Sequence, residues 1–197
     1  MVVTPSTATE PVVVTRKSSV DLFTGKALWD LYLTSFQSLR HRAAARQLLN
    51  RSEFDLEVLD PRVTKYFART PSGRVVGLIT LSNDLTTVPW ISPEFYQARY
   101  PAHSARAAVF YCGIAMVHPD ARSTRAFPQM VSTLGQDISA ADGVLVADMC
   151  SFNIHVVELA RTVTSTLRQA WGSAELVELD RQVYLAWDHP SSGGTAL

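Results

Sequence analysis

Hydrophobic residues in the first quarter of the chain recur three or four positions apart, a spacing that predicts a helix. Residues 41–49 follow and are rich in Ala and Arg, which favours a second helix. The next stretch, from Glu53 to Asp60, carries alternating acids and ends before Pro61. The apolar stripe of the first helix consists of Leu28, Leu31, Tyr32, Ser35, Phe36 and Leu39.

The spacing of hydrophobic residues then changes to the one typical of strands. Residues 63–68 and 74–81 are rich in β-branched and aromatic residues. They flank a Pro-Ser-Gly turn at 71–73, so together they predict a hairpin. A short edge strand is expected before the helices, at 11–15.

Two later segments, 107–117 and 143–149, are almost entirely apolar, as strands buried on both faces are. A helix predicted over 123–140 joins them, so they are expected to lie parallel in an otherwise antiparallel sheet. This order predicts a mixed α/β domain. The remaining expected elements are helices at 93–99 and 153–170 and strands at 174–179 and 182–187.

The chain has 197 residues, enough for one domain with a sizeable core. Residues 1–10 and 190–197 are polar and rich in turn formers. We therefore expect a disordered N-terminal segment and a flexible tail around a single domain at 11–189. Lys plus Arg and Asp plus Glu number 18 each, a balance that does not favour nucleic acid or an anionic membrane as partner.

Location and metal binding follow from what the sequence lacks. No apolar run approaches the ~20 residues that span a bilayer, and the first residues do not have the pattern of a signal peptide. Cys112 and Cys150, the two cysteines, are far apart and indicate a reducing compartment, so the cytoplasm is the expected location. The histidines form no metal-binding pair, and no metal is expected.

A basic loop after the first buried strand carries the most specific pattern. Val117 and Pro119 end the strand, and Arg122 and Arg125 flank the loop before the predicted helix. The segment resembles the acyl-CoA-binding motif of the Gcn5-related N-acetyltransferases (GNAT), in which an x-V-x-P strand end leads into Q/R-x-x-G-x-G/A. Arg125 and Phe127 stand where the motif has glycines.

The GNAT resemblance implies a mixed, mostly antiparallel sheet of six or seven strands, with helices on both faces and a splayed central parallel pair. It also implies that a phosphopantetheine thioester lies in the gap between those strands. Its phosphate would meet a helix N-terminus, which carries unpaired N–H groups and a partial positive charge. The residues thereby assigned to the donor are Met116, Val117, Arg122, Ser123, Thr124, Arg125, Ala126, Phe127 and Asn153.

The replaced glycines bear on the choice of donor, which is either acyl-CoA or an acyl carrier protein. Arg122 and Arg125 offer guanidinium groups that bind phosphate where the backbone cannot approach it. Phe127 would crowd a second phosphate. Our hypothesis is therefore an acyl carrier protein, whose arm has one phosphate.

A second resemblance covers the N-terminal half, which is similar to the N-acyl-homoserine-lactone synthases and the related N-acyl amino acid synthases. In those GNAT-fold enzymes, acids at this spacing and an upstream arginine organise the active site. Thr80 replaces an expected arginine, and residues 111–114 replace a Glu-x-x-Arg pattern, so lactone synthesis is not expected. The matching residues are Arg46, Asp55, Glu57, Asp60, Tyr66, Gly73, Val75, Val76, Gly77, Val88, Pro89, Trp90 and Phe95.

Acyl transfer to an amine needs a base, and Glu57 and Asp60 are the first candidates. Like charges close together raise one pKa toward a useful value. A solvated turn, or a pair with Arg46, is the open alternative. Asp148 ends an apolar strand and must be paired or functional there, while Tyr111 is a candidate acid.

The cysteines and His155 have a structural interpretation as well as a catalytic one. Cys112 and Cys150 are more typical of small buried apolar residues than of nucleophiles. The last predicted helix has no tyrosine in its first turns, where many GNAT enzymes carry an acid. His155 lies there and is either a substitute acid or a surface residue.

The loop between the hairpin and the first buried strand begins with polar residues and continues with aromatic ones. Trp90 and Phe95 are candidates to line an acyl or acceptor pocket, or else pack a connection over the sheet. Asn83 and Asp84 are candidates to bind the acceptor amine, or else cap the loop.

The sequence thus predicts an N-acyltransferase that uses a phosphopantetheine thioester and a small-molecule amine such as an amino acid. The alternative is an inactive GNAT-fold module that binds a thioester ligand or a protein partner. Acyl length, acceptor and oligomeric state are left open.

Overall fold

The computed structural model describes residues 11–187. The expected disordered segment 1–10 and flexible tail 190–197 lie outside the described residues. One sheet has the order β1-β2-β3-β4-β5. Its neighbours are antiparallel except for β4 and β5, which run parallel as predicted. The strands are β1 Val13–Lys17, β2 Thr64–Arg69, β3 Val75–Ser82, β4 Val109–Val117 and β5 Val144–Val146.

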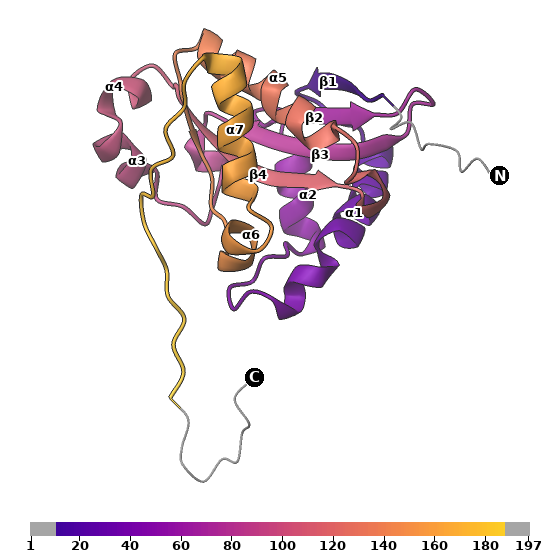
Figure 1. Ribbon diagram of the computed structural model, residues 1–197, viewed down its shortest axis with the longest axis horizontal. Coiled ribbons are helices and arrows are strands. Elements are labelled where there is room, and N and C mark those ends of the chain that lie inside the picture. The colour runs from indigo at the N-terminus through magenta and orange to yellow at the C-terminus, as the bar shows by residue number, and fades with distance from the viewer. Residues whose placement is uncertain (1–10, 188–197) are drawn as a thin grey trace, which may run out of the picture.

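Helices cover both faces of this sheet (Figure 1). α5 and α7 lie on the face turned to the viewer, and α1 and α2 lie on the opposite one, called here the α1–α2 face. None of the helices between residues 11 and 187 is long and apolar enough to cross a membrane. The helices are α1 Leu22–Phe36, α2 Arg51–Leu59, α3 Pro93–Arg99, α4 Pro101–Ser104, α5 Ala126–Ala140, α6 Ser151–His155 and α7 Leu159–Trp171, with 3₁₀ turns η1 Gln37–His41, η2 Leu85–Thr87 and η3 Pro119–Ala121.

The α5 side of the core follows from helical spacing. Met130, Leu134 and Ile138 recur every four residues on α5, are buried, and pack against the sheet. α7 packs on α5, where the Trp171 indole N–H donates to the Gly135 carbonyl at 2.7 Å.

The α1–α2 face is held by aromatic side chains. The Trp29 ring stacks on Tyr32 at a centroid distance of 5.4 Å, and Phe54 of α2 meets it edge-on at 5.2 Å. Phe54 is fully buried. These contacts fix α2 against α1, so α2 ends at a defined place on the sheet.

The two central strands separate early. β5 pairs with β4 only through Val109 to Tyr111, although β4 continues to Val117. The far part of β4 therefore has no ladder partner on its β5 side, which is the divergence that the GNAT resemblance implies.

Several predicted elements differ in extent. The second helix, expected at 41–49, is irregular beyond His41, because the Leu49 N–H donates to the Tyr32 hydroxyl and Arg46 binds Glu53. The acid-rich stretch forms α2 instead. Asn50 and Glu53 cap its start reciprocally, a capping box visible in the sequence.

The C-terminal part departs most from expectation. The strand predicted over 143–149 is limited to β5, and the helix over 153–170 is divided because Glu158 adopts a left-handed conformation with φ of 54°. The strands expected at 174–179 and 182–187 are not formed, so the described sheet has five strands rather than six or seven. A three-residue β5 offers few backbone partners, and the chain after α7 runs away from the body (Figure 1).

Replacing Phe54 by Ala should lower the free energy of unfolding by about 3–5 kcal/mol, because it leaves a cavity between α1, α2 and the sheet. Chemical denaturation measures this loss. Phe23→Ala is the matched control, since the Phe23 side chain is exposed, and should change the free energy by less than about 0.5 kcal/mol. Equal effects of the two changes would contradict the assignment of Phe54 to the core.

Candidate active site

A β-bulge interrupts β4 beside the point where β5 departs. The register with β3 shifts between Ile79 and Leu81, so that Thr80 stands opposite two residues, Gly113 and Ile114. Bulges leave a backbone group unpaired and are frequent next to active sites. Here the bulge frees the Ile114 N–H for a side chain.

Glu57, in the last turn of α2, occupies this bulge. Its Oε1 accepts hydrogen bonds from the Ile114 N–H, at 3.1 Å, and from the Thr80 hydroxyl. A Cβ at position 113 would collide with the carboxylate, so the arrangement requires Gly113. The carboxylate thus lies against β4 just past the last β5 pair.

The second carboxylate oxygen of Glu57 forms no hydrogen bond in the described structure. Oε2 is buried and has no hydrogen-bond partner among residues 11–187. Burial raises the pKa of Glu57 to about 7, while the bonds from Thr80 and Ile114 hold it down. A carboxyl that is half-ionised near neutral pH and has an unused oxygen is suited to accept a proton.

Tyr111 and Asp148 form a second polar unit nearby. The Tyr111 hydroxyl donates to the Asp148 carboxylate and accepts a hydrogen bond from the Trp90 indole N–H at 3.1 Å. Burial and the Asp148 charge raise the pKa of Tyr111, so the phenol stays protonated and orients Asp148. Asp148 also raises the pKa of Glu57.

Asp60 does not join this group, although it was predicted to pair with Glu57. It follows α2 as its C-cap, and its carboxylate binds the Arg62 side chain at 2.6 Å and the Arg62 N–H at 2.8 Å. Arg62 lowers the pKa of Asp60. Burial, rather than a neighbouring Asp60 carboxylate, is thus the main cause of the raised pKa of Glu57.

The open alternative, a pair with Arg46, is not found either. Arg46 binds Glu53 through two hydrogen bonds of 2.7 Å. Glu53 is the residue that caps α2, so this ion pair fixes the start of the helix that ends in Glu57.

The sequence interpretation missed Lys65. This β2 residue is fully buried, and its ammonium donates to the Ser18 carbonyl, at 3.0 Å, and to the Asp60 carbonyl. It stands opposite Thr80 in the β2–β3 ladder. The available signal was a lone charge at an inward position of an apolar strand, two residues before Phe67.

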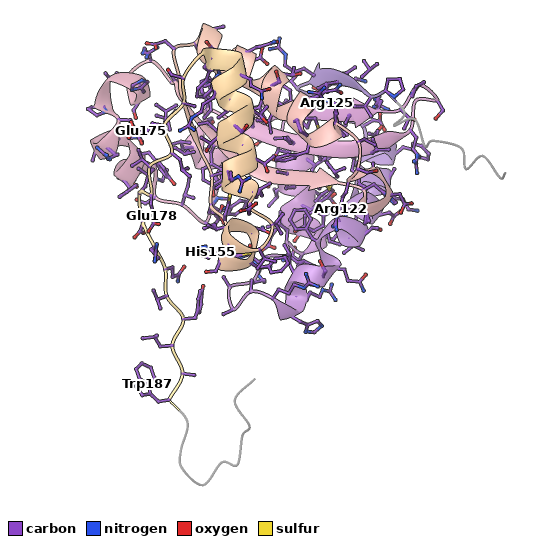
Figure 2. The ribbon with its side chains drawn as sticks, viewed as in Figure 1. Arg122, Arg125, His155, Glu175, Glu178 and Trp187 are labelled. Atoms are coloured by element: carbon purple, nitrogen blue, oxygen red, sulfur yellow. The ribbon has the colours of Figure 1, made fainter. Side chains whose placement is uncertain are left out.

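The predicted donor loop joins β4 to α5 (Figure 2). Arg122 and Arg125 are exposed there, and neither forms an ion pair within the described part of the chain. Thr124 accepts a hydrogen bond from the Ala126 N–H at 3.1 Å, so one donor at the start of α5 is already used. Of the other predicted donor residues, Met116 and Ala126 are buried, Ser123 is exposed, and Val117, Phe127 and Asn153 are half-buried.

The predicted acceptor residues divide in two. The Asn83 amide donates to the Ala107 carbonyl at 2.9 Å, and Asp84 caps η2 and pairs with Arg62, so both have structural roles. Trp90 contacts Tyr111 and belongs to the site. Phe95 is exposed, and its ring meets the Tyr96 ring edge-on at a centroid distance of 5.4 Å.

Two hollows on the surface lie away from these acids. One of about 370 Å³ is lined by residues 39–50, and one of about 440 Å³ lies around Tyr66 and Asp137. Neither is lined by Glu57 or Asp148.

Cys112 is not activated as a nucleophile. Burial raises the pKa of Cys112 to about 12, which keeps its thiol protonated at neutral pH. Residues 11–187 contain no group of three or more His, Cys, Asp or Glu side chains placed to hold a metal ion.

No known family profile matches the sequence, and no curated protein matches it. Solved structures do. An aminoglycoside acetyltransferase from an uncultured soil metagenomic sample, in complex with trehalose, has a TM-score of 0.50 at 8% identity, over 90% of this chain and 97% of its own. A ribosomal-protein-alanine N-acetyltransferase from Brucella melitensis biovar Abortus has a TM-score of 0.49 at 13% identity, over 91% and 100%.

The chain has a GNAT-like fold. At such low identity the similarity establishes the fold alone. Within the GNAT-like sheet, the parallel pair β4 and β5 and the bulge at Gly113 place Glu57 and Asp148 at the strand divergence. The narrower resemblance to the lactone and amino acid synthases stays a prediction.

Stability should depend on pH through Glu57. Because folding raises its pKa from 4.5 to about 7, the folded state binds this proton more tightly than the unfolded state. Relative to Glu57→Gln, the wild type should therefore lose stability as the pH rises from about 4.5 through 7, by roughly 3 kcal/mol in total. Denaturation curves of both proteins across this range measure the difference, and a constant difference would contradict the burial of an ionisable Glu57.

Proposed function

We propose that the chain is an N-acyltransferase that moves an acyl group from a phosphopantetheine thioester to the amine of a small molecule. The single observation that carries this proposal is the buried carboxyl of Glu57, which has a pKa of about 7 and an Oε2 without a hydrogen-bond partner in the described structure. Glu57 binds β4 just past the last residue of β4 that pairs with β5. An unsatisfied buried oxygen destabilises the fold by about 1–3 kcal/mol, so a purely structural role does not explain it. The position of Glu57 at the strand divergence of a GNAT-like sheet supports acyl transfer instead.

The donor arm would lie along the free edge of β4, from Cys112 to Val117, and hydrogen-bond to its backbone. Its phosphate would meet Arg122 and Arg125 at the start of α5. These groups fit a thioester on either CoA or an acyl carrier protein. The replaced glycines and Phe127 favour the carrier protein.

Glu57 would take a proton from the acceptor ammonium, and the neutral amine would attack the thioester carbonyl. The C–N bond forms and the C–S bond breaks; the nitrogen gives up one proton on becoming an amide, and the leaving thiolate takes up one, so the step balances. Asp148, oriented by Tyr111, would hold the acceptor amine through charge-assisted hydrogen bonds. An amino acid is one acceptor of this kind.

A second candidate function is binding of a thioester or a protein partner without turnover. One observation favours it: residues 151–171, which form α6 and α7, contain no tyrosine to protonate the leaving thiolate. His155 on α6 is exposed (Figure 2) and is the available substitute.

Incubating the protein with acyl-CoA or acyl carrier protein thioesters and a panel of amines should yield a new amide, detected by mass spectrometry. Glu57→Gln should lower turnover by 100-fold or more, an order expected for loss of a general base, with donor affinity kept. Donor affinity, measured by calorimetry, is the control that the variant is intact. Donor binding with no amide in any combination would instead support the binding module.

Arg122→Ala should weaken donor binding by about tenfold, because it removes a charge-assisted contact to phosphate worth roughly 1–2 kcal/mol. Arg74→Ala removes an exposed arginine from the β2–β3 turn and is the matched control. Comparing acyl-CoA with acyl-pantetheine carried on a protein in the same assay separates the two donors. Unchanged affinity in Arg122→Ala would mean that the phosphate lies elsewhere.

A further inference from the structure

Lys65 is a charge placed where the fold alone gives no reason for one. Its side chain is fully buried, and the groups that receive its hydrogen bonds are two backbone carbonyls, those of Ser18 and Asp60. Burying an ammonium without a bonded carboxylate is unfavourable by several kcal/mol. An apolar residue of similar length would fill the same strand position.

The position of Lys65 connects it to Glu57 in two ways. It stands opposite Thr80 in the ladder, and the Thr80 hydroxyl donates to Glu57, so both charges lie on the α1–α2 face. It also binds the carbonyl of Asp60, the C-cap of the helix that carries Glu57. A cation at a helix C-terminus is favourable.

We propose that Lys65 is a positioning residue that keeps Glu57 in its charged, proton-accepting form and holds the end of α2 against the β4 bulge. The proposal rests on the function proposed above, in which Glu57 is the base. It assigns to this chain a buried cation on the same face of the sheet as Glu57, bound to the C-cap of the helix that carries Glu57.

Four titratable groups lie near Glu57, three of them on the α1–α2 side and one, Cys112, on the α5 face of β4. Burial raises the pKa of Tyr32 on α1 and that of Cys112 on β4 to about 12 each, so both are neutral near pH 7. The carboxylate of Asp148, after β5, raises the pKa of Glu57 and so opposes its ionisation. Lys65 on β2 is the cation of the group, and it favours ionisation.

The charge on Lys65 is itself limited to a range of pH. Burial lowers its pKa to about 8, against the attraction of Asp60 and Glu57. Glu57 ionises near pH 7, so the charged pair exists mainly between these two values and is lost as Lys65 deprotonates. The acid limb of the pH dependence of the reaction should therefore follow the ionisation of Glu57, which the charge on Lys65 favours.

The direct test is an NMR titration of the Glu57 carboxyl, assigned with Glu57→Gln, in the wild type and in Lys65→Met. Removing the ammonium should make Glu57 a weaker acid by about tenfold or more, equivalent to an upward pKa shift of at least about one unit. Lys26→Met, which removes an exposed lysine of α1, is the matched control and should leave the titration unchanged. An unchanged Glu57 titration in folded Lys65→Met would overturn the proposal.

A reciprocal measurement covers the case in which Lys65→Met does not fold. If the two charges are coupled, neutralising Glu57 must make Lys65 lose its proton more easily, by the same factor. The Lys65 side-chain resonances, followed with pH in wild type and in Glu57→Gln, report this. Equal Lys65 titrations in the two proteins would exclude the coupling.

Kinetics separate positioning from a merely structural role. In Lys65→Met, the acid limb of the kcat/KM profile should move to higher pH, whereas a structural defect would lower the rate equally at every pH. The NMR titrations need no substrate, so their failure leaves the acyl transfer itself standing. Conversely, amide formation that persists in Glu57→Gln would refute the proposed base, whatever the titrations show.

Discussion

A single buried carboxylate, Glu57, sets the constraint on which the rest of this structure depends. Its Oε1 shares the Ile114 N–H that the β4 bulge frees with the Thr80 hydroxyl oxygen, and the absent side chain of Gly113 makes room for the carboxylate. The helix that carries it must then end at one place, which the capping box at its start and the aromatic packing of Phe54 secure. Bulge, glycine and helix are three parts of one arrangement.

The same arrangement explains why the chemistry is placed where it is. β5 leaves β4 after Tyr111, and the bulge that binds the Glu57 carboxyl follows two residues later, at Gly113 and Ile114. Asp148, oriented by Tyr111, brings a second carboxylate to the same edge. Burial strengthens electrostatic interactions, and Lys65 and Asp148 act on Glu57 with opposite sign.

The sequence was informative where local pattern decides structure. The hairpin β2–β3, the buried strand β4 and the helix α3 were predicted nearly at their observed bounds, because a turn signal, an apolar run and a Pro at N1 act locally. Helix α2 was missed, although the Asn50–Glu53 capping box is a local signal. The expected helix at 41–49 failed because tertiary hydrogen bonds overrode propensity.

The candidate site was predicted in part. Glu57, Tyr111 and Asp148 were named from their acid or phenol character, and the structure places Glu57 at the β4 bulge and joins Tyr111 to Asp148 by a hydrogen bond. Asp60, only three residues from Glu57, turns to Arg62 instead, because the helix ends between them. Lys65 was missed although the β2–β3 hairpin was predicted, because its link to Glu57 runs through the Asp60 carbonyl at the end of α2, a helix that the sequence interpretation did not place.

The central claim is that a thioester arm lies along β4 past the divergence, with its carbonyl near Gly113 and Glu57. A crystal structure with a non-hydrolysable acyl-pantetheine analogue tests it most directly. The account predicts hydrogen bonds between the arm and the β4 backbone between Cys112 and Val117, with the carbonyl beside the bulge. An arm bound in the hollow lined by residues 39–50, or β5 paired along all of β4, would contradict it.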